Sequence, residues 1–239
     1  MQTGLILNSI ICLVITGAAF WVSRLILHRE RKRIEDLIIS GFWMVVGLTW
    51  LFVGIGHLIY QSGYTEYDLV LNQFLIQVLI YIQLSLGITY VIHRVFQKKQ
   101  ISLLILFICL TLSAIACYFL AQPEGLVFFD ETYFSVEYKI NEISWNIFQY
   151  LLAFGLVFLF YDTLKRLSKK IKGSKGQSGY LLVNYSILIY SLIGYFDNQG
   201  YNATWTMVLF RSLIILSILL TYLAYIEKPK IIRQKNKSK

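Results

Sequence analysis

The sequence is poor in charged residues and in proline. Aspartate, glutamate, lysine and arginine make up 15% of its 239 residues, whereas hydrophobic residues make up 57%. This balance excludes an ordinary soluble domain, in which about a quarter of the residues are charged. The two prolines, Pro123 and Pro229, both lie outside the long apolar segments, so no proline interrupts a hydrophobic run.

Residues that would indicate catalysis or metal binding are also scarce. The three cysteines fall within apolar segments without a CxxC or Cys/His spacing, so we expect them to pack rather than to bind metal or form a disulfide. The sequence contains no HExxH, GxSxG or P-loop motif. Asp162 is expected to pair locally with Lys165 or Arg166 rather than act as a base. We therefore expect no enzyme, catalytic residue, metal or cofactor.

Long apolar segments dominate the sequence instead. Each has roughly the 20 residues that a helix needs to cross a bilayer. They cover residues 4–25, 37–60, 69–92, 101–121, 142–161, 179–197 and 203–226. The sequence predicts an all-α integral membrane protein, with a bundle of seven transmembrane helices in residues 1–226. A short basic tail, 227–239, is expected to be disordered.

The formal net charge of +9 is distributed unevenly along the chain. All lysines and arginines except Lys139 and Arg211 lie after the first, third, fifth and seventh apolar segments or at their ends. Basic loops mark the cytoplasmic side, so we predict a multi-pass protein of the cell membrane with its N-terminus outside and its C-terminus in the cytoplasm. We interpret the basic clusters as topology signals near anionic lipid, and not as a nucleic-acid-binding surface.

The longest connection, 122–141, lies on the predicted outer side. Several aromatic residues alternate there with carboxylates, and the segment TYFSVEY has the period of a β-strand. Two interpretations fit this pattern. The segment forms either a small hairpin that caps the outer mouth of the bundle or an aromatic patch at the lipid surface.

A weak internal repeat also runs through the chain. Aligning Asn8 with Asn146 brings the first three spans onto the last three without a gap and matches Gly56 with Gly194. Both triplets have the same orientation, with the fourth span as the linker. This pattern is typical of a 3+1+3 parallel repeat, a plan in which a site lies between the two halves.

Polar side chains within the spans are the candidate site residues, because polar groups in hydrocarbon usually face the bundle interior. Most fall in the predicted outer half, and Gln73, Gln77 and Tyr81 share one helix face by their four-residue spacing. We therefore predict an outward-facing polar pocket for a small-molecule ligand. Its residues are Arg211, Gln73, Gln77, Tyr81, Asn146, Gln149, Tyr190, Tyr195, Asp197 and His57.

The same residues have structural interpretations that the sequence leaves open. The amides would form hydrogen bonds across packed helices. His57 would be a hydrogen-bonded packing residue or a pH-sensitive group. Arg211 would pair with Asp197 or Glu142, bind an anionic group, or extend toward the membrane surface.

Several aromatic and basic features follow one another in a characteristic order. They are Trp50 in the second span, the aromatic connection 122–141, Trp145 and Tyr150 in the fifth span, the basic segment 165–175 and the polar turn GYFDNQG in which the sixth span ends. This layout resembles the seven-transmembrane N-terminal sensor region of bacterial histidine kinases. The resemblance implies a membrane sensor or ligand-binding module. No kinase domain is present in the sequence, so we expect output through a separate cytoplasmic partner.

Two other functions fit the same spans. One is a small-solute transporter built on the 3+1+3 repeat. Sugar carriers of that plan flex at prolines inside their helices, and these spans contain none. The other is a non-catalytic accessory subunit of a membrane complex, in which the polar residues serve only assembly.

Overall fold

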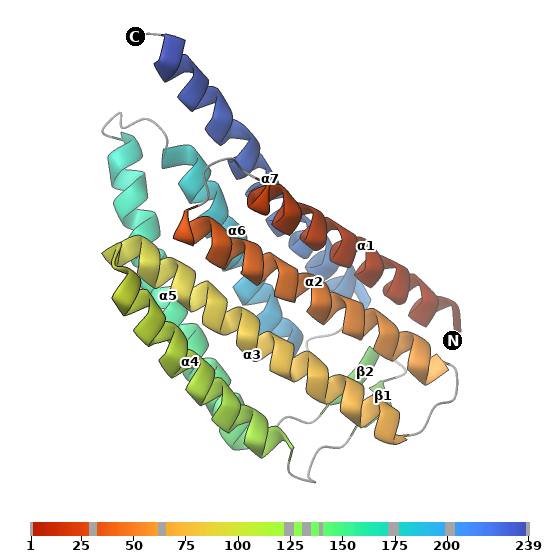
Figure 1. The fold of residues 1–239 in the computed structure, drawn as a ribbon. Helices are drawn as coiled ribbons and strands as arrows, with labels where there is room; N and C mark the ends of the chain where they lie inside the picture. Colours follow the sequence, from red (N-terminus) through yellow and green to blue (C-terminus); the bar gives the residue numbers. More distant parts are fainter. Residues whose placement is uncertain are drawn as a thin grey trace.

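The computed structural model describes residues 2–28, 33–61, 66–121, 127–130, 135–138, 141–171, 177–198 and 204–237. Helices account for most of these residues (Figure 1). They are α1 (Gln2–Leu27), α2 (Ile34–Gln61), α3 (Glu66–Phe96), α4 (Lys99–Leu120), α5 (Glu142–Ile171), α6 (Gln177–Asn198) and α7 (Thr204–Lys237). All seven are long and apolar enough to cross a membrane. The predicted all-α bundle of seven membrane-spanning helices is confirmed.

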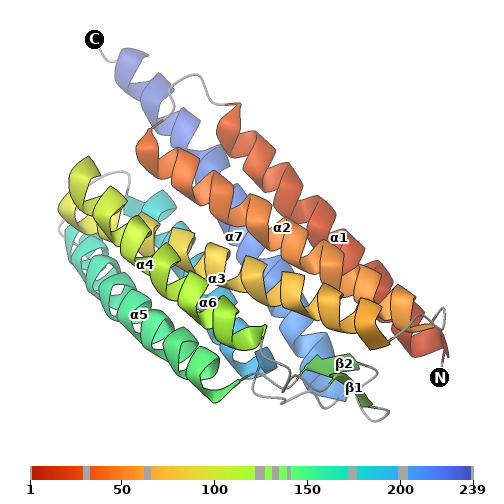
Figure 2. The ribbon, with the colours of Figure 1, turned by 60° about the horizontal axis from the view of Figure 1, so that its bottom comes forward.

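Successive helices run in alternating directions, so their connections gather at two ends of the bundle (Figures 1 and 2). We call one end the basic end, because it holds the lysine-rich and arginine-rich connections α1–α2, α3–α4 and α5–α6. We call the opposite end, which holds the start of α1 and the two strands, the hairpin end. The prediction that the basic end faces the cytoplasm stays a prediction.

Helix α3 occupies the centre of the bundle. Two clusters of buried side chains form the core, and α3 contributes to both. The larger cluster joins α3 mainly to α1, α2, α6 and α7, and the smaller joins it to α4 and α5. Of the seven spans, α3 is the most buried and α4 the least. The polar residues of α3 are therefore placed to contact both halves of the bundle.

Small residues allow α1 and α2 to pack closely. The hydroxyl of Ser23 donates to the carbonyl of Ser40 at 2.9 Å, and the hydroxyl of Ser40 donates to the carbonyl of Ser23 at 3.0 Å. Gly47 of α2 lies against the ring of Phe20, where an added Cβ would be 2.7 Å from Cδ1 and Cε1. Close approach at small residues is how helices associate in lipid, where hydrophobic burial gives no driving force between them.

The two strands lie within the segment 122–141. Strand β1 (Val127–Asp130) pairs antiparallel with β2 (Ser135–Tyr138), so that Val127 lies opposite Tyr138 and Asp130 opposite Ser135. The pair contacts α2 and α3 at the hairpin end (Figure 2). The side chains of this segment are outside the described part of the chain.

Helix α7 reaches Lys237 and so includes most of the basic tail 227–239. The expected disorder of this tail stays a prediction. Lysine, arginine and glutamine favour the helical state, which permits the extension. The 3+1+3 repeat stays a prediction. The two triplets also pack differently, because α1 lies mainly on α2 whereas α5 packs against α3, α4 and α6.

Candidate functional site

The first polar cluster lies in the hairpin half of the bundle, between α2 and α7. The guanidinium carbon of Arg211 is 4.2 Å from the centre of the Trp50 ring, and both side chains are buried. A cation over an indole face is an attractive arrangement, and it is stronger where water is excluded. His57 follows two turns later on the same face of α2 and lies near Arg211.

His57 also connects this cluster to α1. Its Nε2 lies 3.3 Å from the amide nitrogen of Asn8, and the Asn8 amide oxygen accepts from the Cys12 thiol at 3.9 Å. With the Asn8 nitrogen as donor, Nε2 of His57 accepts, and the hydrogen of the neutral ring is assigned to Nδ1.

Two ring nitrogens in this cluster have no hydrogen-bond partner among the described residues. They are Nε1 of Trp50 and Nδ1 of His57, and both are buried. Nε1 of Trp43, two turns before Trp50 on the same face, has the same property. A buried donor without an acceptor costs roughly 1–3 kcal/mol, and most such groups in proteins are paired. One face of α2 thus carries three buried ring nitrogens that have no hydrogen-bond partner within the described part of the chain.

A second group of polar side chains lies near the middle of the bundle. The amide oxygen of Gln83 in α3 accepts from the hydroxyl of Thr49 in α2 at 3.4 Å and from that of Tyr190 in α6 at 3.2 Å. The Tyr190 ring also packs edge-to-face against Trp43, with centroids 5.9 Å apart. Gln83 was not among the predicted site residues. It shares a helix face with Tyr90 and Arg94, which lie further along α3.

A third group lies between α3 and α5. The hydroxyl of Tyr81 donates to the carbonyl of Ser144 at 2.6 Å and lies 2.7 Å from the Ser144 hydroxyl. Trp145 stacks between Phe148 and Tyr195, with centroid separations of 5.2 and 6.0 Å. These contacts join α5 to α3 and α6, and none of the residues in them has a buried polar atom without a partner in the part of the chain described.

The structure therefore divides the predicted pocket residues among different sides of α3. It brings Arg211 and His57 together with Trp50, places Tyr190 with Gln83, and directs Tyr81 and Tyr195 toward α5. Gln77 is buried one turn from Tyr81, Gln73 and Gln149 are half-buried, and Asn146 is exposed. The side chain of Asp197 is outside the described residues. The described contacts of these residues thus form separate groups, and a single ligand pocket built from all of them stays a prediction.

The sequence interpretation missed a charged cluster at the basic end. Nη2 of Arg94 in α3 donates to Oδ2 of Asp162 in α5 at 2.9 Å, and each side chain is only 1% exposed. Asp162 also accepts from Nε of Arg166 at 3.2 Å and from the amide of Asn184 in α6 at 2.9 Å. The local pairing predicted for Asp162 is confirmed with Arg166, whereas Nζ of Lys165 lies over the ring of Tyr161.

The same cluster reaches α2. Glu35 lies between two arginines, 3.4 Å from Nη1 of Arg33 and 4.0 Å from Nε of Arg94. The Tyr180 ring of α6 lies 4.2 Å from the guanidinium carbon of Arg94 and 4.6 Å from that of Arg166.

Helix α7 joins this end of the bundle through Tyr225, whose hydroxyl donates to Asp36 of α2 at 2.8 Å. We call the set Arg33, Glu35, Asp36, Tyr90, Arg94, Asp162, Arg166, Tyr180, Asn184 and Tyr225 the basic-end network. The network contains as many carboxylates as arginines, so its positive and negative charges balance. The network therefore couples helix positions rather than offering a site for an ion of one sign.

No other chemistry stands out in the described residues. Among them, no group of three histidine, cysteine, aspartate or glutamate side chains could hold a metal ion. The chain matches no protein-family model and no curated protein sequence.

Proposed function

We propose that the protein is an integral membrane sensor that binds a small anionic ligand in the hairpin half of its helix bundle. The ligand lies beside Arg211, Trp50 and His57. The supporting observation is the pair of buried donors on one face of α2, Nε1 of Trp50 and Nδ1 of His57, without an acceptor in the described part of the chain. A carboxylate would accept hydrogen bonds from such donors and would be attracted by the nearby guanidinium.

The proposal also assigns a role to the basic-end network. Helix α2 carries Glu35 and Asp36 at its basic end, Trp50 just beyond its middle and His57 near its hairpin end. Helices α2 and α7 meet both at the ligand cluster, through Trp50 and Arg211, and at the basic end, through Asp36 and Tyr225. A ligand that binds more tightly to one relative position of α2 and α7 increases the population of that position. The basic-end network then changes with it, and a separate partner would detect this change.

Thermal unfolding of the purified protein in detergent tests the ligand site. We expect at least one member of a panel of C2–C6 carboxylates to raise the Tm saturably. Trp50→Phe should abolish this increase, because it removes the indole donor and leaves an aromatic ring in place. Without ligand, the variant should fold with only a modest change in Tm, because removal of an unsatisfied buried donor partly offsets the lost indole packing and the weaker contact with Arg211.

Trp145→Phe is the matched control. It makes the same substitution in a tryptophan that stacks on Phe148 and Tyr195, away from Arg211. It should leave the ligand-induced increase in Tm intact. A panel without any stabilising carboxylate, or an increase that survives in Trp50→Phe, would contradict the proposed site.

A transporter is the second candidate function, and one observation favours it. Gln83, Thr49 and Tyr190 place polar groups in the middle of the bundle, between the ligand cluster and the basic-end network. Proteoliposomes loaded with the stabilising carboxylate separate the two functions. Flux that Arg211→Ala abolishes would indicate a transporter, whereas saturable stabilisation without flux would indicate a sensor. An accessory subunit would show neither.

A further inference from the structure

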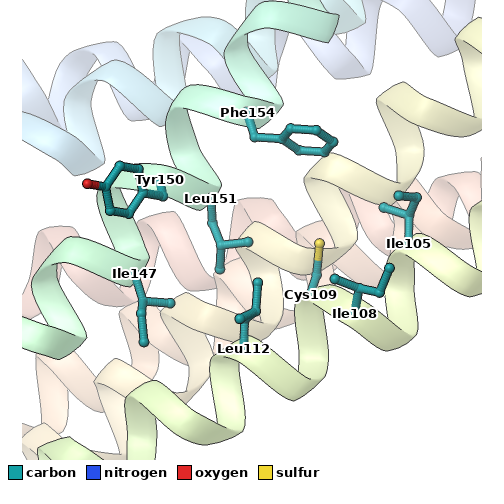
Figure 3. A pocket seen from close by; sticks show the side chains of 8 residues that line it. All are labelled: Ile105, Ile108, Cys109, Leu112, Ile147, Tyr150, Leu151 and Phe154. Atoms are coloured by element: carbon teal, nitrogen blue, oxygen red, sulfur yellow. The ribbon is translucent and has the colours of Figure 1, made fainter.

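An open apolar groove lies between α4 and α5, on the edge of the bundle farthest from the ligand cluster. Its volume is about 470 Å³. Ile105 and Leu112 line it from α4, and Ile147 and Phe154 line it from α5 (Figure 3). Tyr150 also borders it and is 76% exposed, so the groove opens to the surroundings of the bundle. In a membrane those surroundings are lipid.

Figure 3 shows Leu112 and Ile147 toward one end of the groove and Ile105 and Phe154 toward the other. The second end points toward the basic end of the bundle, because α4 begins there and α5 finishes there. The groove therefore runs in the direction of the membrane normal and not parallel to the membrane plane.

A lysine continues each wall of the groove at the basic end. Lys165 follows Ile147 by about five helical turns, so it lies close to the face that α5 turns to the groove. Lys98 stands immediately before the first turn of α4, about two helical turns from Ile105. Lys98 is the N-cap residue of α4, positioned by a tight turn in which Gln97 has a φ of 55°. Both lysines are exposed, and Nζ of Lys165 lies 5.8 Å from the centre of the Tyr161 ring.

We propose that this groove binds one acyl chain of an anionic phospholipid, with the lipid phosphate between Lys98 and Lys165. The chemistry of the two parts matches such a lipid, since the groove is apolar and its basic end is positive. The depth also matches. At about 1.5 Å of rise per residue, Ile105 lies roughly 10 Å and Leu112 roughly 20 Å from Lys98. One leaflet of a hydrocarbon core is about 15 Å deep, so the groove follows the distal part of the chain to the bilayer centre.

Lipid titration followed by native mass spectrometry tests the headgroup contacts. The full-length protein in detergent is titrated with dioleoylphosphatidylglycerol and, separately, with dioleoylphosphatidylcholine. We expect tighter binding of the anionic lipid. The double variant Lys98→Gln/Lys165→Gln should weaken phosphatidylglycerol binding by at least about tenfold, to the level of phosphatidylcholine, as expected for the loss of two surface lysines.

The double variant Lys99→Gln/Lys170→Gln is the charge-matched control. It removes two lysines from the same helices at positions turned away from the groove, and should change phosphatidylglycerol binding less than about twofold. Equal losses in the two double variants would mean that the lipid responds only to overall charge, and would overturn the proposed site.

Filling the groove tests the acyl-chain contacts. Ile108→Trp places an indole in the groove wall and should weaken binding of both lipids, whereas Leu104→Trp, at an exposed position of α4 outside the groove, should not. Unchanged lipid binding by Ile108→Trp would overturn the proposal. So would a photo-crosslinker at position 108 that captures a membrane polypeptide instead of lipid in the native membrane.

Discussion

Asp162→Ala is expected to lower the free energy of unfolding by about 3–5 kcal/mol, because it leaves a buried arginine without its carboxylate. Asp162 accepts from Arg94, Arg166 and Asn184, and Arg94 is only 1% exposed in its side chain. Equilibrium unfolding in mixed detergent micelles measures the change. Glu142→Ala is the control, since Glu142 is an exposed carboxylate on the same helix, and its loss should cost at most about 1 kcal/mol.

A second variant separates the cost of an unpaired charge from the value of the ion pair. Arg94→Met/Asp162→Leu removes both charges and should recover most of the lost stability, because apolar residues often replace a buried ion pair without loss. If Glu35, 4.0 Å from Arg94, could substitute for Asp162, the single variant would lose no more than Glu142→Ala. That result would contradict the assignment of Asp162 as the central acceptor of the basic-end network.

The double variant also bears on the function. If the network transmits ligand binding, the variant should fold and bind the carboxylate as tightly as the parent. It should then lose any ligand-dependent change at the basic end, measured by fluorescence of a probe on the α5–α6 connection.

The seven helices were predictable because lipid leaves the backbone few alternatives. Every peptide group within a membrane must form its hydrogen bond inside the protein, so a sufficiently long apolar segment becomes a helix. The bounds were less predictable. Helix α5 continues to Ile171, about three turns beyond the apolar segment that ends at 161, because lysine and arginine extend a helix without contributing hydropathy.

Helix neighbours could not be predicted from the same signals. The spacing of Gln73, Gln77 and Tyr81 places them on one helix face, but spacing does not identify the helix that this face contacts. Tyr81 faces Ser144 of α5, whereas Arg211 lies on Trp50 of α2. Residues that were predicted to share one pocket thus make their described contacts on separate sides of α3.

The basic-end network was missed for a related reason. The pairing of Asp162 with Arg166 was visible, because the two residues lie one turn apart on a helix. The pairing of Asp162 with Arg94 spans 68 positions of sequence and leaves no local pattern. Arg94 was instead interpreted as one of many basic residues that mark the cytoplasmic side. Its burial against a carboxylate depends on how α3 and α5 pack, which hydropathy does not specify.

Gly47→Leu is expected to destabilise the protein by about 2–3 kcal/mol, since extra side-chain volume in a packed interface forces its neighbours apart. A Cβ at this position would lie 2.7 Å from Cδ1 and Cε1 of Phe20, so α1 must shift or the ring must turn. Gly17→Leu is the control. Apart from its chain neighbours and the backbone of its own helix, no described atom lies within 4 Å of a Cβ at Gly17, and a better helix former there should be neutral or stabilise by at most about 1 kcal/mol.

The double variant Gly47→Leu/Phe20→Ala should recover stability relative to Gly47→Leu, because it removes the clashing ring. The same interface holds Asn8 of α1 against His57 of α2, at 3.3 Å. A displaced α1 withdraws Asn8 from the ligand cluster, so Gly47→Leu should also reduce the carboxylate-induced increase in Tm, and Phe20→Ala should restore it. If Gly47→Leu lowers stability but leaves the ligand effect unchanged, α1 contributes to the fold and not to the site.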